Sequence, residues 1–307
     1  MEREKVRFVS GGTECVAWHY PGSNGTCVIM VGGFSVTKEP ATDLFAKRFN
    51  DAGFGVLAFD YRRIGESGGE PRLVLPVKDQ LADWQAAIAF AATLPGVDPA
   101  KIALWAFSMS GGHAIRVAAE NPQVAAVIAQ TPYTGDLTAT RSAASFQKPL
   151  AMVRFSAIGI IDAIAGLFGR PPRLVPLAGE PGTLSFLTTP DGLDGSRALA
   201  PGNKYPEWQQ TVAARSALGV VVFYRPGRAA SRVQCPLLVV VCDEDTTTLP
   251  SAVIQVAEQA PQGEAVHLPG SHYAPFLAAH EQAVDAELSF LQRHLLAEPA
   301  PAQGGRA

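Results

Sequence analysis

The chain has 307 residues, of which 47% are hydrophobic and 17% are charged, and this composition excludes a disordered protein. The formal net charge of -3 is small for this length and excludes the strongly basic surface of a nucleic-acid-binding protein. The length accommodates one large domain, or one domain that carries an inserted cap, and we favour the second arrangement.

Short apolar runs alternate with longer helical patterns along most of the chain. Residues 6–9 and 15–20, separated by Gly11 and Gly12, predict an opening antiparallel pair of strands. Further strands are predicted at residues 27–31, 55–59, 102–106, 124–130, 236–242 and 265–268, and helices at residues 43–52 and 78–93. Continuous apolar runs are typical of buried parallel strands. The expected fold class is therefore α/β, with a mostly parallel central sheet and helices on both faces.

The regular alternation is lost between residues 133 and 232, a segment that we interpret as an inserted cap or lid over a substrate pocket. Within it, residues 152–168 are apolar nearly all round, and residues 169–202 are rich in proline and glycine. So long a segment with little periodicity is usually functional. The alternative is that the apolar helix only completes the core. The remaining divisions are a catalytic domain of residues 1–132 and 233–296 and a flexible tail of residues 297–307.

A strand that runs directly into a serine carries the main chemical signal. Residues 102–112 match the nucleophile elbow G-x-S-x-G around Ser108, with Ala106 and Ser110 in the glycine positions. The sharp turn exposes the serine Oγ and directs the amide of Met109 toward a developing oxyanion. Ser110 is rejected as the nucleophile, because the strand would then have to continue through Ser108. The remaining alternative for Ser108 is an ordinary helix N-cap.

A nucleophilic serine needs a base and an acid, and both are found later in the chain. An acidic loop follows the strand 236–242, and we select Asp245 as the acid, with Asp243 as the fallback. The base is His272, in a loop between the last strand and the final helix. The order Ser108, Asp245, His272 is the one expected when an elbow serine, an acid and a histidine form a triad.

The second oxyanion donor is expected in the loop after the strand 27–31. This loop contains Gly32 and Gly33 followed by Phe34, whose amide is the candidate donor, although the two glycines could equally form only a tight turn. The pairs of histidines lack the spacing of metal ligands, so we expect no metal and no cofactor. The four cysteines are expected to be buried thiols; they are Cys15, Cys27, Cys235 and Cys242.

Targeting signals are not evident in the sequence. The charged residues that follow Met1 lead into no apolar stretch of the kind that a signal peptide contains, and no run approaches the ~18 apolar residues of a membrane helix. A cytoplasmic protein without membrane contact is therefore expected.

Four segments together resemble the α/β-hydrolases, and among them the hydrolases and acyltransferases of bacterial and fungal polyketide pathways. The segments are residues 31–35, residues 59–72, residues 104–113 and the loops that contain Asp245 and His272. The resemblance implies an α/β-hydrolase fold with an inserted cap and a Ser–Asp–His triad. The chain departs from the family pattern at Gly32, where histidine is usual, and at Ala106, where glycine is usual.

The resulting hypothesis is a serine hydrolase that cleaves an ester or thioester through an acyl-enzyme on Ser108. A hydrophobic, polyketide-like acyl substrate is suggested by four aromatic residues of the cap, Phe146, Phe155, Phe168 and Phe186. The alternatives are an acyltransferase or carrier-protein thioesterase of secondary metabolism, and a non-catalytic ligand-binding protein. The partners considered are the small-molecule acyl substrate, an acyl carrier protein and a second copy of the chain. Arg62 and Glu66 are interpreted as a structural loop, with a substrate contact by Arg62 as the alternative.

Overall fold

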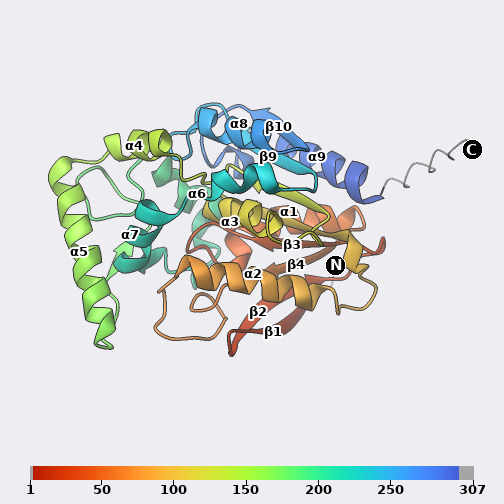
Figure 1. Ribbon diagram of the computed structural model, residues 1–307, viewed down its shortest axis with the longest axis horizontal. Helices are drawn as coiled ribbons and strands as arrows, with labels where there is room; N and C mark the ends of the chain where they lie inside the picture. Colours follow the sequence, from red (N-terminus) through yellow and green to blue (C-terminus); the bar gives the residue numbers. More distant parts are fainter. Residues whose placement is uncertain (1–2, 297–307) are drawn as a thin grey trace, which may run out of the picture.

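The computed structural model describes residues 3–296, and a single eight-stranded sheet runs through the larger part of it (Figure 1). The strand order is β1-β2-β4-β3-β5-β6-β9-β10. Strand β2 is antiparallel to β1 and β4, and the other neighbours are parallel. The strands are β1 (Glu4–Ser10), β2 (Thr13–Tyr20), β3 (Cys27–Val31), β4 (Gly55–Phe59), β5 (Ile102–Phe107), β6 (Ala126–Gln130), β9 (Leu237–Cys242) and β10 (Gly263–Leu268). The prediction of a mostly parallel sheet is confirmed.

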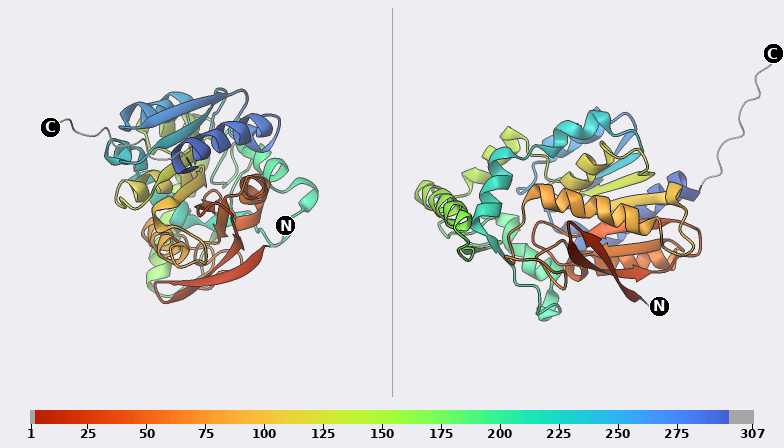
Figure 2. Two further views of the ribbon diagram at one scale, coloured as in Figure 1. Left: turned by 90° about the vertical axis from the view of Figure 1, so that its right-hand side faces the viewer. Right: turned by 60° about the horizontal axis from the view of Figure 1, so that its bottom comes forward.

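Helices cover both faces of this sheet, as Figure 2 shows. One face packs against α2 (Val77–Ala91), α3 (Met109–Ala118) and α8 (Pro250–Gln259), and the other against α1 (Lys38–Asp51) and α9 (His280–Leu291). Successive side chains of a strand point to opposite faces. In β5, for example, Leu104 packs with the α2 side of the core and Trp105 with the α1 side. The buried strands are therefore apolar throughout because each contributes to two cores.

Helix α1 begins at Lys38 rather than at residue 43, where the apolar spacing placed its start. Lys38 is buried, and its ammonium lies 2.9 Å from the Asp60 carboxylate and 2.7 Å from that of Glu66. The first turn thus buries a paired charge beside Pro40 and Ala41, and a search for apolar periodicity does not count a buried lysine as part of the buried face.

The segment between β6 and β9, here called the cap, projects from one end of the sheet (Figure 1). Its helices are α4 (Leu137–Ser145), α5 (Pro149–Leu167), α6 (Gly195–Leu199) and α7 (Ala214–Phe223), and its strands are β7 (Leu174–Pro176) and β8 (Thr211–Ala213). Helix α5 packs against α7, where the Asp162 carboxylate accepts hydrogen bonds from the guanidinium of Arg215 at 2.9 and 3.0 Å. The short antiparallel pair β7–β8 was not expected from the sequence.

Helix α5 differs from expectation in two ways. Its 19 residues have a mean hydropathy of 1.8, so by length and composition alone it could cross a membrane. The prediction that no apolar run approaches the length of a membrane helix was therefore wrong. One such helix is weak evidence for a membrane protein. Only 17% of this apolar window is buried, and therefore α5 does not complete the core either.

The four cysteines are free thiols, with Cys15, Cys27 and Cys242 buried and Cys235 half-buried. Burial raises the pKa of the Cys27 thiol to about 12, so this side chain stays protonated and behaves as a small apolar group. The tail expected at residues 297–307 lies outside the described residues.

Candidate active site

Strand β5 ends at the turn that carries Ser108. This residue has φ 54° and ψ -118°, a conformation rarely adopted by a residue with a side chain, and α3 begins at the next residue. The turn is fixed by the Ser108 amide, which donates to the Gln130 carbonyl at 2.9 Å, and by the Ser108 carbonyl, which accepts from the Tyr133 amide at 2.9 Å. The hydroxyl is consequently held above the carboxyl end of β5, at the edge where parallel strands assemble their sites.

The residues around the turn are small because the chain passes very close to it. A Cβ atom on Gly112 would collide with the Tyr133 carbonyl oxygen and would lie 2.7 Å from a ring carbon of Pro226. Ser110 takes one of the usual glycine positions, and its buried hydroxyl accepts a hydrogen bond from Tyr61 at 2.9 Å. Ser110 is therefore enclosed in the core, whereas Ser108 faces the cavity.

Three side chains from distant loops meet at Ser108. The Nε2 atom of His272 lies 3.0 Å from the Ser108 Oγ, and its Nδ1 atom lies 2.7 Å from Oδ2 of Asp245. An ionised carboxylate only accepts hydrogen bonds, so Nδ1 carries the proton and Nε2 is free to accept the proton of the serine. The arrangement is that of a nucleophile, a base and an orienting acid.

The acid is held by its own loop. The amides of Thr247 and Thr248 donate to Oδ1 of Asp245 at 2.8 and 2.6 Å, and the Thr248 hydroxyl donates to Oδ2 at 2.7 Å. The imidazole of His272 has no exposed surface and packs on the ring of Phe107, with 4.9 Å between the centroids. The base therefore has a single orientation, directed at the serine.

Burial alone would lower the pKa of His272, but the carboxylates of Asp245 and Asp191 outweigh this effect and raise its pKa above the usual value. The site thus favours the positively charged imidazole, which is the form that a histidine takes when it acts as a base toward a serine.

The fallback acid has a different partner. Asp243 lies 2.8 Å from Nδ1 of His267, and both side chains are about half exposed.

Another buried histidine, His113, is enclosed between Tyr224, at 2.7 Å, and Gln80, at 3.2 Å, and burial lowers its pKa to about 3. Within residues 3–296, no group of three or more acidic, histidine or cysteine side chains is arranged to hold a metal ion.

The two expected oxyanion donors lie at the same cavity as the serine. Phe34 and Met109 both line this cavity, and among the described residues neither amide donates to a protein acceptor. The glycines before Phe34 also make the turn that the sequence allowed as an alternative, because the Val36 amide donates to the Gly33 carbonyl at 3.2 Å.

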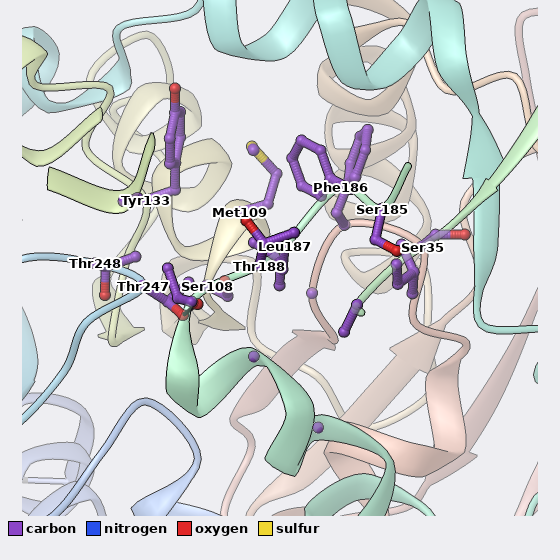
Figure 3. A pocket seen from close by; sticks show the side chains of 18 of the residues that line it. Ser35, Ser108, Met109, Tyr133, Ser185, Phe186, Leu187, Thr188, Thr247 and Thr248 are labelled. Atoms are coloured by element: carbon purple, nitrogen blue, oxygen red, sulfur yellow. Dashed lines mark hydrogen bonds between the residues drawn. The ribbon is translucent and has the colours of Figure 1, made fainter. Parts of the chain in front are cut away.

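The cavity above Ser108 has a volume of about 430 Å³ and lies between the sheet and the cap. Seen as in Figure 3, Ser108 lies between Thr247 and Thr248 on one side and Ser185 and Phe186 on the other. Cap residues that give the wall its apolar character are Met152, Phe155, Phe186, Leu187 and Val221. Of the four aromatic cap residues that suggested a hydrophobic substrate, Phe155 and Phe186 line the cavity; Phe168 is 77% exposed and, like Phe146, does not line it.

Of two further residues, one agrees with its sequence interpretation and the other was missed by the sequence analysis. Arg62 does not line the cavity; its guanidinium lies 2.5 Å from the buried Asp83 carboxylate, so the structural interpretation holds. Asp191, a cap residue that no motif indicated, is buried beside the catalytic loops and accepts hydrogen bonds from the amide and hydroxyl of Thr246 at 2.8 and 2.6 Å.

Comparison with known proteins agrees with this architecture. Residues 28–286 match the alpha/beta hydrolase family. Quorum-quenching protein AidA of Acinetobacter baumannii is 34% identical over 293 residues, 94% of each chain, and polyketide transferase af380 of Aspergillus fumigatus is 27% identical over 96% of this chain and 99% of the transferase. The crystal structure of the alpha/beta hydrolase GrgF from a Penicillium species superposes with a TM-score of 0.78 at 23% identity, covering 97% of this chain and 100% of GrgF, and so shares the fold. The predicted resemblance to polyketide-related proteins is confirmed, and the chain belongs to the alpha/beta hydrolase family.

Proposed function

We propose that the protein is a serine hydrolase that cleaves an ester or thioester of a hydrophobic acyl group through an acyl-enzyme on Ser108. The observation that carries this proposal is the continuous hydrogen-bonded chain from Ser108 through His272 to Asp245 at the floor of an apolar cavity. Such a chain activates a hydroxyl that is otherwise a weak nucleophile.

In the proposed reaction, Nε2 of His272 takes the proton of Ser108 as the serine oxygen attacks the acyl carbonyl. The amides of Phe34 and Met109 donate to the resulting oxyanion. As the bond to the leaving alcohol or thiol breaks, His272 returns the proton to the leaving atom, and the acyl group remains on Ser108. A water molecule, deprotonated by the same imidazole, then attacks the acyl carbon; the bond to Ser108 Oγ breaks, His272 returns the proton to this oxygen, and the free acid leaves. Asp245 keeps the imidazole in the required tautomer throughout.

The cavity indicates the class of substrate. Its volume of about 430 Å³ lies within the usual range for small-molecule sites, and its cap wall is largely apolar. An acyl chain buried there gains stabilisation roughly in proportion to its apolar area. The relative AidA is named a quorum-quenching protein, which makes quorum signalling one setting for such an activity.

A second candidate is acyl transfer, in which an alcohol or amine replaces water in the second step. It is favoured by the relative named polyketide transferase, which aligns over 96% of this chain. A carrier-protein-bound thioester would enter the same mechanism as the acyl donor. Competition between water and an added alcohol or amine, followed by mass spectrometry of the product, separates hydrolysis from transfer.

The nucleophile is tested with a fluorophosphonate probe, which reacts covalently with activated serines. The wild-type protein should be labelled, and Ser108→Ala should not be labelled at all. The matched control is Ser110→Ala, which alters a buried hydroxyl two residues away that only contacts Tyr61 and should leave labelling intact. Labelling that survives in Ser108→Ala, or that is lost in Ser110→Ala with the fold preserved, would contradict the assignment.

The substrate class is tested with p-nitrophenyl and N-acetylcysteamine acyl esters of increasing chain length. We expect kcat/KM to rise with chain length until the cavity is filled, because each buried methylene contributes about 0.8 kcal/mol. A preference for acetyl over longer chains would contradict the proposed hydrophobic substrate.

A further inference from the structure

We propose that Asp191 is a positioning residue of the cap: it holds the acid and base loops in register and places a second negative charge beside His272. The proposal rests on the function proposed above. It makes the cap a part of the catalytic apparatus as well as the wall of the substrate cavity.

The contacts of Asp191 reach both catalytic loops. Its Oδ1 atom accepts from the hydroxyls of Thr246 and Thr247 at 2.6 and 2.7 Å, and its Oδ2 atom accepts from the amide of Thr246 at 2.8 Å and, more weakly, from that of Thr247 at 3.3 Å. Oδ2 also lies 3.4 Å from the amide of His272. One carboxylate thus bridges the loop that carries the acid and the loop that carries the base.

The charge of Asp191 lacks the partner that a buried carboxylate usually has. Among the described residues, no lysine or arginine forms an ion pair with it, and the one cationic group that stabilises its charge is His272. Burial opposes its ionisation, yet His272 and the threonine donors lower the pKa of Asp191 to about 2. A buried carboxylate without a fixed cation is costly. Here the cost of burying the Asp191 charge is offset most when the His272 imidazole is protonated. In the proposed mechanism, His272 is protonated while it holds the proton taken from Ser108.

The same stretch of the cap also closes the site. Thr189 and Gly192, on either side of Asp191, line the cavity, and the Thr189 hydroxyl lies 2.7 Å from that of Thr247. A Cβ atom on Gly195 would lie 2.9 Å from the Tyr273 hydroxyl, so the chain passes tightly over the residue that follows the catalytic histidine. When this stretch packs against the two loops, it therefore closes the cavity and also fixes the geometry of the triad.

The polar and titratable groups that face the His272 ring come from four elements. Asp245 and Thr248 belong to the loop after β9, Ser108 to the elbow after β5, Tyr273 to the base loop itself and Asp191 to the cap. Of these, only the two aspartates are charged. Removal of the Asp191 charge should therefore lower the pKa of His272 and leave Asp245 as its only anionic neighbour.

The experiment compares Asp191→Asn, Asp191→Ala and the control Asp194→Asn by the rate of fluorophosphonate labelling across pH. An asparagine can still accept the two backbone amides while its NH2 group donates to the threonine hydroxyls, so Asp191→Asn removes the charge and keeps most of the bridge. We expect its labelling to persist to lower pH than in the wild type, with a high-pH plateau within a few-fold of the wild-type rate. Asp191→Ala removes the bridge as well, and its plateau should fall on the order of 10- to 100-fold.

Asp194 lies on the same stretch and pairs with Arg197 at 3.0 Å. Asp194→Asn should therefore change neither the fall of the labelling rate at low pH (the acid limb) nor the plateau of that rate at high pH. The proposal is wrong if Asp191→Asn has the wild-type acid limb, or if it does not fold, which would make the carboxylate a structural requirement only. An unlabelled wild-type protein would instead contradict the proposed function, so the two failures are distinct.

Discussion

Asp243 and Asp245 are separated by one residue on the same loop, yet their carboxylates face different histidines. Asp245 is buried and lies 2.7 Å from Nδ1 of His272, while Asp243 lies on the surface beside His267. The difference arises because the loop turns back on itself, with the Asp245 amide donating to the Cys242 carbonyl at 3.2 Å. Only one of two chemically identical side chains is thus available to orient the base.

The pair provides a direct test of the acid. Asp245→Asn keeps the shape of the side chain but presents an NH2 group or a neutral oxygen to Nδ1, which disturbs both the tautomer and the charge of His272. We expect turnover of an acyl ester to fall on the order of 10³- to 10⁴-fold. Asp243→Asn alters an exposed pair and should change turnover less than two-fold or so. A large loss in the second variant and none in the first would reverse the assignment.

At this scale, the sequence could predict residues whose position is marked by a neighbouring strand. Ser108 follows β5 directly, and Asp245 and His272 follow the last two strands in the expected order. Asp191 has no such marker, because it lies in an aperiodic part of the cap and its partner Thr246 is 55 residues away in the chain. A role that depends on contacts so distant leaves no local pattern.

Helices α3 and α7 illustrate how differently the elements of this protein are packed. In α3, Gly112 faces the chain at Tyr133 and the ring of Pro226, so the helix approaches the start of the cap more closely than any side chain would allow. In α7, an added Cβ on Gly219 would have no atom within 4 Å. The first glycine is required by packing, whereas the second only costs backbone entropy.

Replacing each glycine with alanine should therefore change stability in opposite directions. Gly112→Ala forces the elbow helix away from the cap and should destabilise the protein by about 1–3 kcal/mol. Gly219→Ala adds a better helix former in open space and should stabilise it by up to about 1 kcal/mol. Urea unfolding followed by circular dichroism measures both. Equal effects of the same sign would refute this account of the packing.

The elements that the sequence could predict are those with strong periodicity. Helix α2 was expected at residues 78–93 and is observed at Val77–Ala91, because its buried face repeats every three or four residues. Strands β7 and β8 have three residues each, too few for a period to emerge. The start of α1 escaped detection because Lys38 and Asp60 are buried as a pair.

Helix α9 is joined to the central sheet by an unusual acid. Glu287 of α9 is fully buried, and its Oε2 atom accepts a hydrogen bond from the indole of Trp105 in β5 at 2.9 Å. Its Oε1 atom has no partner among the described residues. Burial raises the pKa of Glu287 well above its ordinary value, so the folded protein holds this carboxyl in its neutral form.

The pH dependence of global stability follows from this shift. Between the ordinary pKa of glutamate and the raised pKa in the folded state, the folded protein binds one more proton than the unfolded chain. The free energy of unfolding should therefore fall with rising pH, by about 1.4 kcal/mol per pH unit from this residue. Glu287→Gln has no proton to lose and keeps an acceptor for Trp105, so its stability should fall less as the pH rises above the ordinary pKa of glutamate.

Urea unfolding at several pH values measures this difference. The control is Glu281→Gln, on the same helix but exposed and paired with Arg48, which lowers the pKa of Glu281. Its contribution is already complete above the ordinary glutamate pKa, so its curve should run parallel to that of the wild type. Parallel curves for Glu287→Gln as well would show that the carboxyl is not held neutral.

For the molecule as a whole, the mostly parallel sheet followed from the apolar runs. The way the cap docks did not, because polar contacts such as those of Asp191 and Asp162 hold it in place. Polar contacts depend on the relative placement of side chains that are distant in the chain, and the hydropathy pattern of a sequence does not indicate that placement.

The complete enclosure of His272 has a consequence for how protons would move in the proposed reaction. The imidazole has no exposed surface: its Nδ1 atom contacts the Asp245 carboxylate and the Thr248 hydroxyl, and its Nε2 atom contacts the oxygen of Ser108, which lines the cavity. Once an acyl substrate occupies that space, a proton taken from Ser108 has the departing oxygen or sulfur as its destination. The reaction would then conserve its proton internally, isolated from the surrounding buffer until the leaving group carries it away.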